Sequence, residues 1–251
     1  MPVSRSEAAL FAEQTYHMTG KGGKTRRINR INKNIEKTGF IVDREHSGRD
    51  VVVFHNPNTR ELHIAHRGTD LLGRRAIQDL QSDISVVLGT TRKDAHFKTR
   101  TKQTVAGLEA YPDYRATASG HSLGGKSLIT SMVTNPDARN RITRADTFNA
   151  GATLFKEKEM KVLDKEARDE LQNKMVHHRT KDDIISASML VNKPLGDIKT
   201  YKTKKQFGKE QEIKEASSGL GDALPKGDRE AMVHAHTMDH FYNKTKYHDD
   251  E

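Results

Sequence analysis

The spacing of hydrophobic residues changes along the chain from a helical pattern to short strand-like runs. Residues 5–18 place alanine, leucine and tyrosine three to four positions apart, which predicts an amphipathic helix. Three short apolar runs follow, and the break at 55–61 between the last two contains the turn-forming sequence Asn-Pro-Asn. This pattern predicts an antiparallel hairpin arrangement. The three runs are Phe40–Val42, Val51–Phe54 and Leu62–Ala65.

After residue 76, helical and strand-like patterns alternate, which is typical of a wound α/β sheet. We therefore expect an α/β fold built on a mixed, mostly parallel sheet with flanking helices. The sequence predicts helices at about 98–111, after 122 and at 156–174. It predicts strands at 114–119 and 175–178, and a further strand that ends in TFNAGA (147–152).

Two segments are basic and rich in glycine or serine. Residues 19–34 predict a basic loop that re-enters a helix near Ile31, and residues 192–228 predict a long, partly mobile surface insertion. Neither an internal repeat nor a clean boundary is evident. We therefore expect residues 1–251 to form a single domain that carries the basic insertion 192–228.

Composition excludes several classes of protein. The 251 residues are 33% hydrophobic, and no run approaches the roughly 18 apolar residues of a membrane span. The absence of cysteine excludes a disulfide scaffold and a thiol nucleophile. The first 18 residues lack the basic and apolar regions of a secretory signal. These features are compatible with the cytosol or with a particle such as a virion.

The balance of 43 basic against 34 acidic residues gives a net charge of +9. Such a charge favours association with anionic surfaces, of which phospholipid is a better candidate here than nucleic acid. The basic stretches 21–33 and 199–209 are either solvated loops or an electrostatic docking surface for anionic lipid.

The sequence GHSLGGKS at 120–127 matches two motifs at once. It contains G-x-S-x-G, in which a serine lies on a tight strand-to-helix turn, and G-x-x-x-x-G-K-S, which cradles phosphate. A nucleotide site also needs a later apolar strand that ends in aspartate. The nearest candidate is Asp146, and the preceding sequence RNRIT is not apolar. The nucleotide-binding alternative is therefore poorly supported.

An acyl hydrolase needs an oxyanion hole, an acid and a histidine, with the order Ser, Asp, His along the chain. Each has a candidate in that order. The strand 62–67 runs into a turn at Gly68-Thr69, which can present Thr69 beside the N–H of Leu123. Asp182 and Asp183 follow the predicted strand at 175–178, and His234, His236 and His240 come last.

Together these motifs resemble the class 3 lipases, a family of α/β-hydrolase-fold serine esterases. The resemblance covers about residues 6–186 and a short C-terminal motif. It depends on the order and separation of AHRGTD (65–70), DLQSD (79–83), GHSLGG (120–125), TFNAGA (147–152) and DDII (182–185).

The resemblance implies an α/β-hydrolase-like fold and a role for each candidate residue. Ser122 would be the nucleophile, Thr69 and Leu123 the oxyanion donors, and Asp183 the acid. His236 of HTMDHF would be the base, with His240 as the second choice. The implied activity is hydrolysis of a lipid or other carboxylic ester without a cofactor. The basic surface favours a phospholipid as the substrate.

Two alternatives remain open at the level of sequence. One is the nucleotide-binding protein that would use Lys126 and Ser127, and the other is a non-catalytic basic binding protein on a hydrolase scaffold. The C-terminal histidines, with His177 and His178, could also bind a metal. Because neither HExxH nor a paired carboxylate accompanies them, we expect structural or solvated histidines and no metal site.

Overall fold

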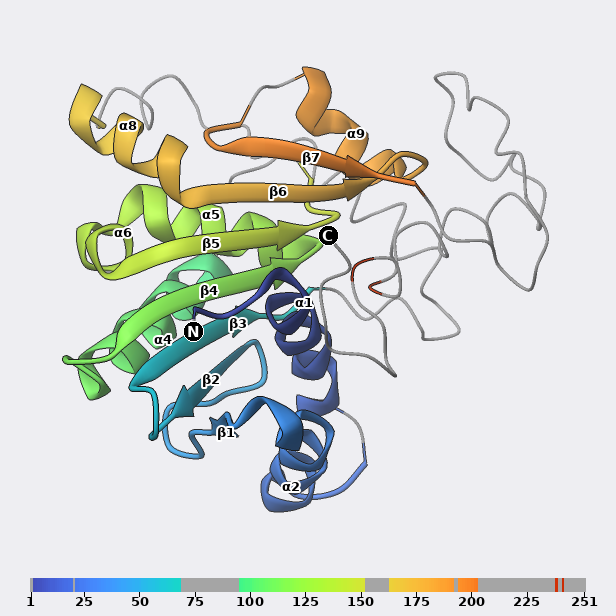
Figure 1. Ribbon diagram of the computed structural model, residues 1–251, viewed down its shortest axis with the longest axis vertical. Coiled ribbons are helices and arrows are strands. Elements are labelled where there is room, and N and C mark those ends of the chain that lie inside the picture. Colours follow the sequence, from blue (N-terminus) through green and yellow to red (C-terminus); the bar gives the residue numbers. More distant parts are fainter. Residues whose placement is uncertain are drawn as a thin grey trace.

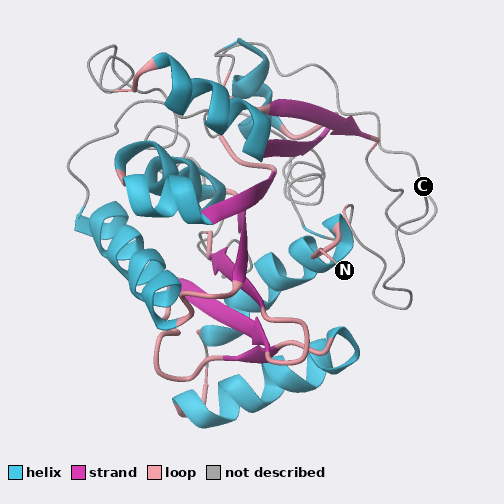
Figure 2. Cartoon of the chain, turned by 60° about the vertical axis from the view of Figure 1, so that its left-hand side comes forward, coloured by secondary structure: helices cyan, strands magenta, loops and turns pink. Residues whose placement is uncertain are grey.

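A computed structural model describes residues 2–19, 21–68, 95–151, 163–191 and 194–202, together with Met238 and Phe241. In this part of the chain, seven strands form one sheet between layers of helices (Figures 1 and 2). The strands are β1 (Ile41–Val42), β2 (Val51–Asn56), β3 (Glu61–His66), β4 (Arg115–His121), β5 (Ile142–Phe148), β6 (Met175–Thr180) and β7 (Asp197–Tyr201). The helices are α1 (Arg5–Gln14), η1 (Thr15–Met18), α2 (Lys24–Ile35), η2 (Glu36–Thr38), α4 (Ala95–Ala110), α5 (Leu123–Thr134), α6 (Pro136–Arg141), α8 (Lys165–Lys174) and α9 (Ile184–Val191).

The sheet is mixed and mostly parallel, as the sequence predicts. Its spatial order follows the chain order from β1 to β7. Strands β1 to β3 pair antiparallel, and β3 to β7 pair in parallel. The parallel strands therefore end at the same edge, where open α/β sheets place their functional groups.

Apolar side chains cover both faces of the sheet. Along β2, Val51 and Val53 lie in one apolar cluster, and Val52 and Phe54 lie in the other, as the two-residue period of a strand requires. The first cluster, the α5-side core, includes side chains of α4, α5, α6 and α8. The second, the α1-side core, includes side chains of α1 and α2. Figure 1 shows these two groups of helices on opposite sides of the sheet.

The expected N-terminal helix is confirmed as α1 followed by η1. A capping box begins it, in which Ser4 Oγ accepts from Glu7 N–H and the Glu7 carboxylate accepts from Ser4 N–H. The helix expected near Ile31 is present as α2, but it begins earlier, at Lys24, so most of the loop expected before Ile31 is wrong. The residues Ile28, Ile31 and Ile35 lie three and four positions apart and are buried in the α1-side core. This apolar stripe determines the structure of the segment despite its charge and glycines.

Two further boundaries differ from the expectation. The helix expected at 156–174 is not continuous, because α8 begins at Lys165 and Asp164 caps it by accepting from Ala167 N–H at 2.8 Å. Residues 152–162 lie outside the described part. Strand β7 was not expected, because the polar sequence DIKTY lies within the basic segment 192–228. The rest of that insertion, from residue 203 onward, lies outside the described residues.

Histidines are built into the middle of this sheet as neutral, hydrogen-bonded groups. His63 bonds Thr117 Oγ1 and Ser119 Oγ, each at 2.8 Å, so its ring bridges β3 and β4. His66 bonds Ser127 Oγ at 3.1 Å and Thr104 Oγ1 at 2.9 Å. Burial lowers the pKa of each imidazole to about 3.

Among the described helices, none is long and apolar enough to cross a bilayer.

These two histidines should make the protein sensitive to mild acid. The unfolded chain takes up a proton on each below its ordinary pKa of 6.5, whereas the folded chain does so only near 3. Stability is therefore full above about pH 6.5 and falls as the pH drops. We expect each histidine to cost about 2 kcal/mol of unfolding free energy between pH 6.5 and about pH 5.

Chemical denaturation at about pH 7 and about pH 5 measures this loss. His63→Gln is the matched variant, because its amide can hydrogen bond but does not titrate in this range. It should lose about 2 kcal/mol less than the wild type over the same interval. An unfolding free energy that is equal at both pH values would contradict the assignment of neutral buried histidines.

Candidate active site

Strand β4 passes into helix α5 through a single residue, Ser122. The strand ends at His121 and the helix begins at Leu123. Ser122 has φ 54° and ψ −125°, a conformation that a residue with a side chain adopts only under strain. This is the backbone geometry of the G-x-S-x-G turn at the C-terminal edge of the sheet. The Ser122 residue is 4% exposed. We call the turn formed by residues 120–124 the elbow.

Glycines permit the close packing of this turn. A Cβ at Gly124 would lie 2.2 Å from the carbonyl oxygen of His66, and one at Gly120 would lie 2.6 Å from the backbone of Gly124. A Cβ at Gly125 would lie 2.5 Å from the Ala150 Cβ. The first turn of α5 therefore presses directly against the ends of its neighbouring strands, and no larger residue fits at these positions without a shift.

The same geometry does not support the nucleotide-binding alternative. A phosphate-cradling loop needs open backbone between its first glycine and its lysine. Here Gly120 lies within β4, and Lys126 lies within α5. The Lys126 side chain is only 2% exposed, and its burial lowers the pKa of its ammonium group. The backbone at Gly124 is already packed against His66 and Arg67, so it cannot close around a phosphate.

The TFNAGA motif connects the elbow to the next strands. The carbonyl oxygen of Phe148 accepts from Ser122 N–H at 3.0 Å. Asn149 follows with φ 45°, and its Oδ1 accepts from Thr180 N–H at 2.9 Å. Its own N–H donates to the His178 carbonyl at 2.8 Å. The last residue of β5 and the residue after it thus fix the ends of β4 and β6 relative to one another.

Asp183 lies just beyond β6, at the same edge of the sheet as Ser122. Its side chain is 2% exposed, whereas that of the neighbouring Asp182 is partly exposed. Asp183 Oδ2 accepts from Ser186 N–H at 2.9 Å and so caps helix α9. Asp183 therefore has the structural role of a helix cap, which an aspartate at the start of a helix commonly has. One strand, β5, separates the strand of Asp183 from that of Ser122.

The turn that leads to Thr69 approaches the elbow from β3. A Cβ at Gly68 would lie 2.5 Å from the His121 carbonyl oxygen and 3.1 Å from Ser122 Cβ. Thr69 itself lies outside the described residues. Leu123, the other expected oxyanion donor, is the first residue of α5. Its backbone N–H belongs to the helix terminus that carries partial positive charge.

A buried ionic cluster holds this turn in place. Arg100 Nη1 donates to the carbonyl oxygen of Arg67 at 2.8 Å, and its Nη2 donates to Asp50 Oδ1 at 3.4 Å. Arg67 Nη2 donates to the same oxygen of Asp50 at 3.0 Å. Burial alone would raise the pKa of Asp50, but Arg100 and Arg67 outweigh it and hold that pKa below its usual value. The carboxylate therefore remains charged.

Tyr16 is a residue at this site that sequence reasoning missed. Its hydroxyl oxygen lies 2.6 Å from His121 Nδ1. A Cβ at Gly68 would lie 2.5 Å from the Tyr16 hydroxyl oxygen and 3.1 Å from Ser122 Cβ. The phenol is thus beside the elbow although it is 106 residues earlier in the chain. No local pattern marks it, because a tyrosine on a helix is ordinarily a packing residue.

The C-terminal histidines His234, His236 and His240 lie outside the described residues. The nearest described positions are Met238 and Phe241, both buried in the α1-side core. The ring of Phe241 lies 5.1 Å from that of Phe148, whose carbonyl binds the elbow.

His177 and His178 have protein partners in place of a metal. His177 bonds Thr147 and the Leu195 carbonyl, and His178 bonds Asp146 Oδ1 at 2.8 Å. No group of three or more metal-ligating side chains is found among the described residues.

The chain is similar to several solved lipase structures. Lipase II from Rhizopus niveus is 16% identical with a TM-score of 0.49, over 72% of each chain. Rhizomucor miehei lipase in its propeptide complex is 12% identical with a TM-score of 0.42, over 71% of this chain and 60% of that chain, which is less than two thirds. A triacylglycerol lipase whose catalytic centre is described as a serine protease triad is 13% identical with a TM-score of 0.47, over 71% of this chain and 70% of that chain. No protein-family model and no curated protein matches. Such low identities and TM-scores assign neither a family nor an activity.

The glycine packing of the elbow can be tested by adding one methyl group. Gly124→Ala places a Cβ against the His66 carbonyl oxygen, so we expect it to lower the unfolding free energy by about 1–3 kcal/mol or more. Gly23→Ala is the control, because nothing lies within 4 Å of its Cβ. It should cost less than about 1 kcal/mol. Urea denaturation measures both, and equal losses would contradict the close packing of α5 on β3.

Proposed function

We propose that this protein is a serine-dependent carboxylic ester hydrolase that acts on lipid esters. The observation that carries the proposal is the backbone of Ser122, with φ 54° and ψ −125° between β4 and α5. A strained serine at a strand-to-helix junction is expensive to maintain, and such strain is concentrated at functional sites. The buried carboxylate of Asp183, at the same edge of the sheet, supplies the second component.

In the proposed mechanism Ser122 attacks the ester carbonyl as a histidine removes its proton. The backbone N–H of Leu123 and the Thr69 turn stabilise the tetrahedral oxyanion. Asp183 orients the histidine through the carboxylate oxygen that does not cap α9. The protonated histidine then gives its proton to the leaving alcohol, and water hydrolyses the acyl-enzyme to restore the serine.

His236 is the proposed base, and His240 is the alternative. Both are close in sequence to the buried pair Met238 and Phe241. The contact of Phe241 with Phe148 supports a C-terminal segment that returns to the strand beside the elbow. The chain order Ser, Asp, His agrees with that of α/β-hydrolases.

Phospholipid is the substrate class that we favour, because a net charge of +9 draws the protein toward anionic surfaces. The remaining rival is a non-catalytic protein on the same scaffold. A scaffold without chemistry would have no need of a strained serine, and this argues against the rival.

A fluorophosphonate probe tests the proposal, because it reacts only with an activated serine. We expect labelling of the wild type and of Ser131→Ala, which removes one of the buried serines of α5, but not of Ser122→Ala. His236→Gln should slow hydrolysis of a soluble short-chain ester by about a thousandfold or more, and His240→Gln should have little effect.

The reverse result for the two histidine variants would assign the base to His240. A wild type that neither labels nor hydrolyses any ester of a lipid panel would favour the non-catalytic rival.

Arg100 should act as a positioning residue for the oxyanion hole. Arg100→Lys keeps the charge but cannot bond the Arg67 carbonyl and Asp50 together in the same geometry. Because loss of an oxyanion donor costs about a hundredfold or more, its displacement should lower kcat by about ten- to a hundredfold. The KM for a soluble ester should change much less.

The matched control is Arg141→Lys, because Arg141 also donates to backbone carbonyls, those of Leu108 and Tyr111, but on α6. It should leave kcat within about twofold, since no donor of the site moves. Equal losses of kcat in both variants would show that Arg100 matters only for general stability.

A further inference from the structure

Helix α2 and the short helix η2 that follows it carry a stripe of four basic side chains. Arg26, Arg30 and Lys33 are spaced four and three residues apart, which places them on one side of α2. Lys37 follows four residues after Lys33, in η2. All four are exposed. Ile28, Ile31 and Ile35 point to the opposite side and are at most 5% exposed. We call the four basic residues the α2 basic stripe.

The α2 basic stripe lacks compensating acids. None of its four side chains takes part in an ion pair with the described residues, and Glu36 is the one acid in the sequence 21–41. Within α2, Arg26 and Arg30 place like charges four residues apart, which destabilises a helix. The packing of the three isoleucines supports the helix against this cost. An external anionic partner would remove the repulsion.

Helix α2 is fastened to the segment that contacts the elbow. Arg27 Nη1 donates to the Met18 carbonyl at 2.6 Å, and Asn34 Nδ2 donates to Gln14 Oε1 at 2.7 Å. Met18 and Tyr16 belong to the same short helix η1, and the Tyr16 hydroxyl lies beside Gly68 and His121. A surface bound by α2 is therefore connected to the candidate active site through η1.

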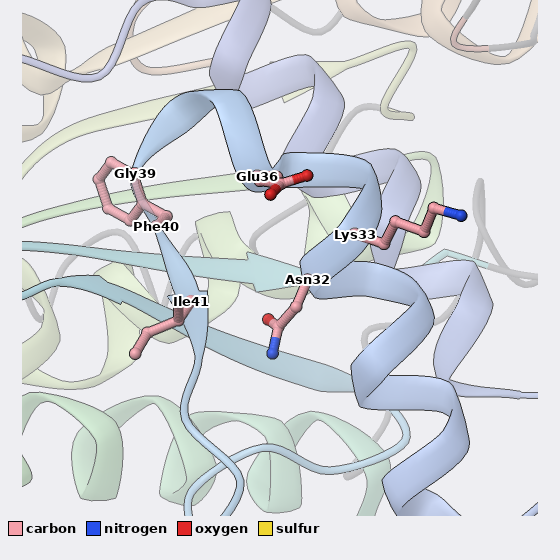
Figure 3. A pocket seen from close by; sticks show the side chains of 6 residues that line it. All are labelled: Asn32, Lys33, Glu36, Gly39, Phe40 and Ile41. Carbon is pink, nitrogen blue, oxygen red and sulfur yellow. The ribbon is translucent and has the colours of Figure 1, made fainter.

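The pocket beside α2 does not explain the stripe. It has a volume of 410 Å³ and is lined by Asn32, Lys33, Glu36, Gly39, Phe40 and Ile41 (Figure 3). Asn32 Oδ1 is already engaged by Val42 N–H at 2.9 Å, and Figure 3 shows Lys33 extending outward from the helix. The lining offers no second cation that converges with Lys33. The basic side chains therefore serve an extended surface better than a small ligand.

We propose that the α2 basic stripe docks this protein on an anionic phospholipid membrane and so brings Ser122 to its ester substrate. The choice of lipid rests on the proposed function. Independent support comes from shape, because one buried side leaves α2 a single outward row of charge, which fits a flat anionic surface. Residues 21–37 contain no aromatic side chain on which a nucleic acid base could stack.

The test uses two quadruple variants in a Ser122→Ala background, so that the lipid is not consumed. The stripe variant combines Arg26→Gln, Arg30→Gln, Lys33→Gln and Lys37→Gln. The control removes equal charge from exposed lysines of α4, α8 and β7 by Lys98→Gln, Lys102→Gln, Lys165→Gln and Lys199→Gln. Both are mixed with vesicles of phosphatidylcholine, with and without phosphatidylserine, and sedimented.

The stripe variant should bind the phosphatidylserine vesicles about a hundredfold or more weakly than the parent, and the control less than about tenfold more weakly. The difference should vanish near 1 M salt, where charges are screened within about 3 Å. Equal losses in the two variants, parent binding that ignores phosphatidylserine, or stronger parent binding to duplex DNA or RNA than to vesicles would overturn the proposal.

Failure of the proposed function gives a different result. With Ser122 restored, both quadruple variants should hydrolyse a water-soluble ester as the wild type does. Selective loss of vesicle binding without any ester hydrolysis by the wild type would leave the docking surface in place and reject the esterase.

Discussion

The sharp turn at Ser122 is the constraint on which the rest of the site depends. One residue must reverse the chain from β4 into α5, and it adopts φ 54° to do so. Such a turn costs of order 1–3 kcal/mol and persists only where the surroundings determine it. The strands on either side hold this turn in place. Gly124 packs against the end of β3, and the Phe148 carbonyl of β5 accepts from Ser122 N–H.

Buried polar groups also link the four strands β3 to β6. His63 joins β3 to β4, His178 joins β6 to Asp146 of β5, and Arg100 joins α4 to the end of β3. Buried polar groups specify geometry well when all their partners are present. Strands β3, β4 and β6 lead to Gly68, Ser122 and Asp183. Directional hydrogen bonds as well as apolar packing thus fix these strands relative to one another. This rigidity suits a site whose groups must be held within fractions of an ångström.

Local patterns predicted the parts of the site that are local. The G-x-S-x-G turn, the hairpin of β2 and β3, and an acid after β6 follow from short motifs and from strand and turn chemistry. The parts that were missed depend on distant contacts or on competing signals. Tyr16 reaches His121 only through the tertiary fold. In α2 the isoleucine spacing was present, but glycine and charge obscured it, and β7 is a polar strand that only its pairing with β6 defines.

The N-terminal segment connects the two proposals through one physical argument. Helix α2 has too much like charge to be stable alone, so its isoleucines must be buried against α1 and the sheet. The same packing fixes η1, and η1 places the Tyr16 hydroxyl against the elbow. The packed segment from α1 to α2 carries both the α2 basic stripe and the Tyr16 contact. The exposed basic side chains and the buried Ser122 therefore have a fixed orientation relative to one another. A docked α2 would therefore orient the elbow as well as hold the protein at the surface.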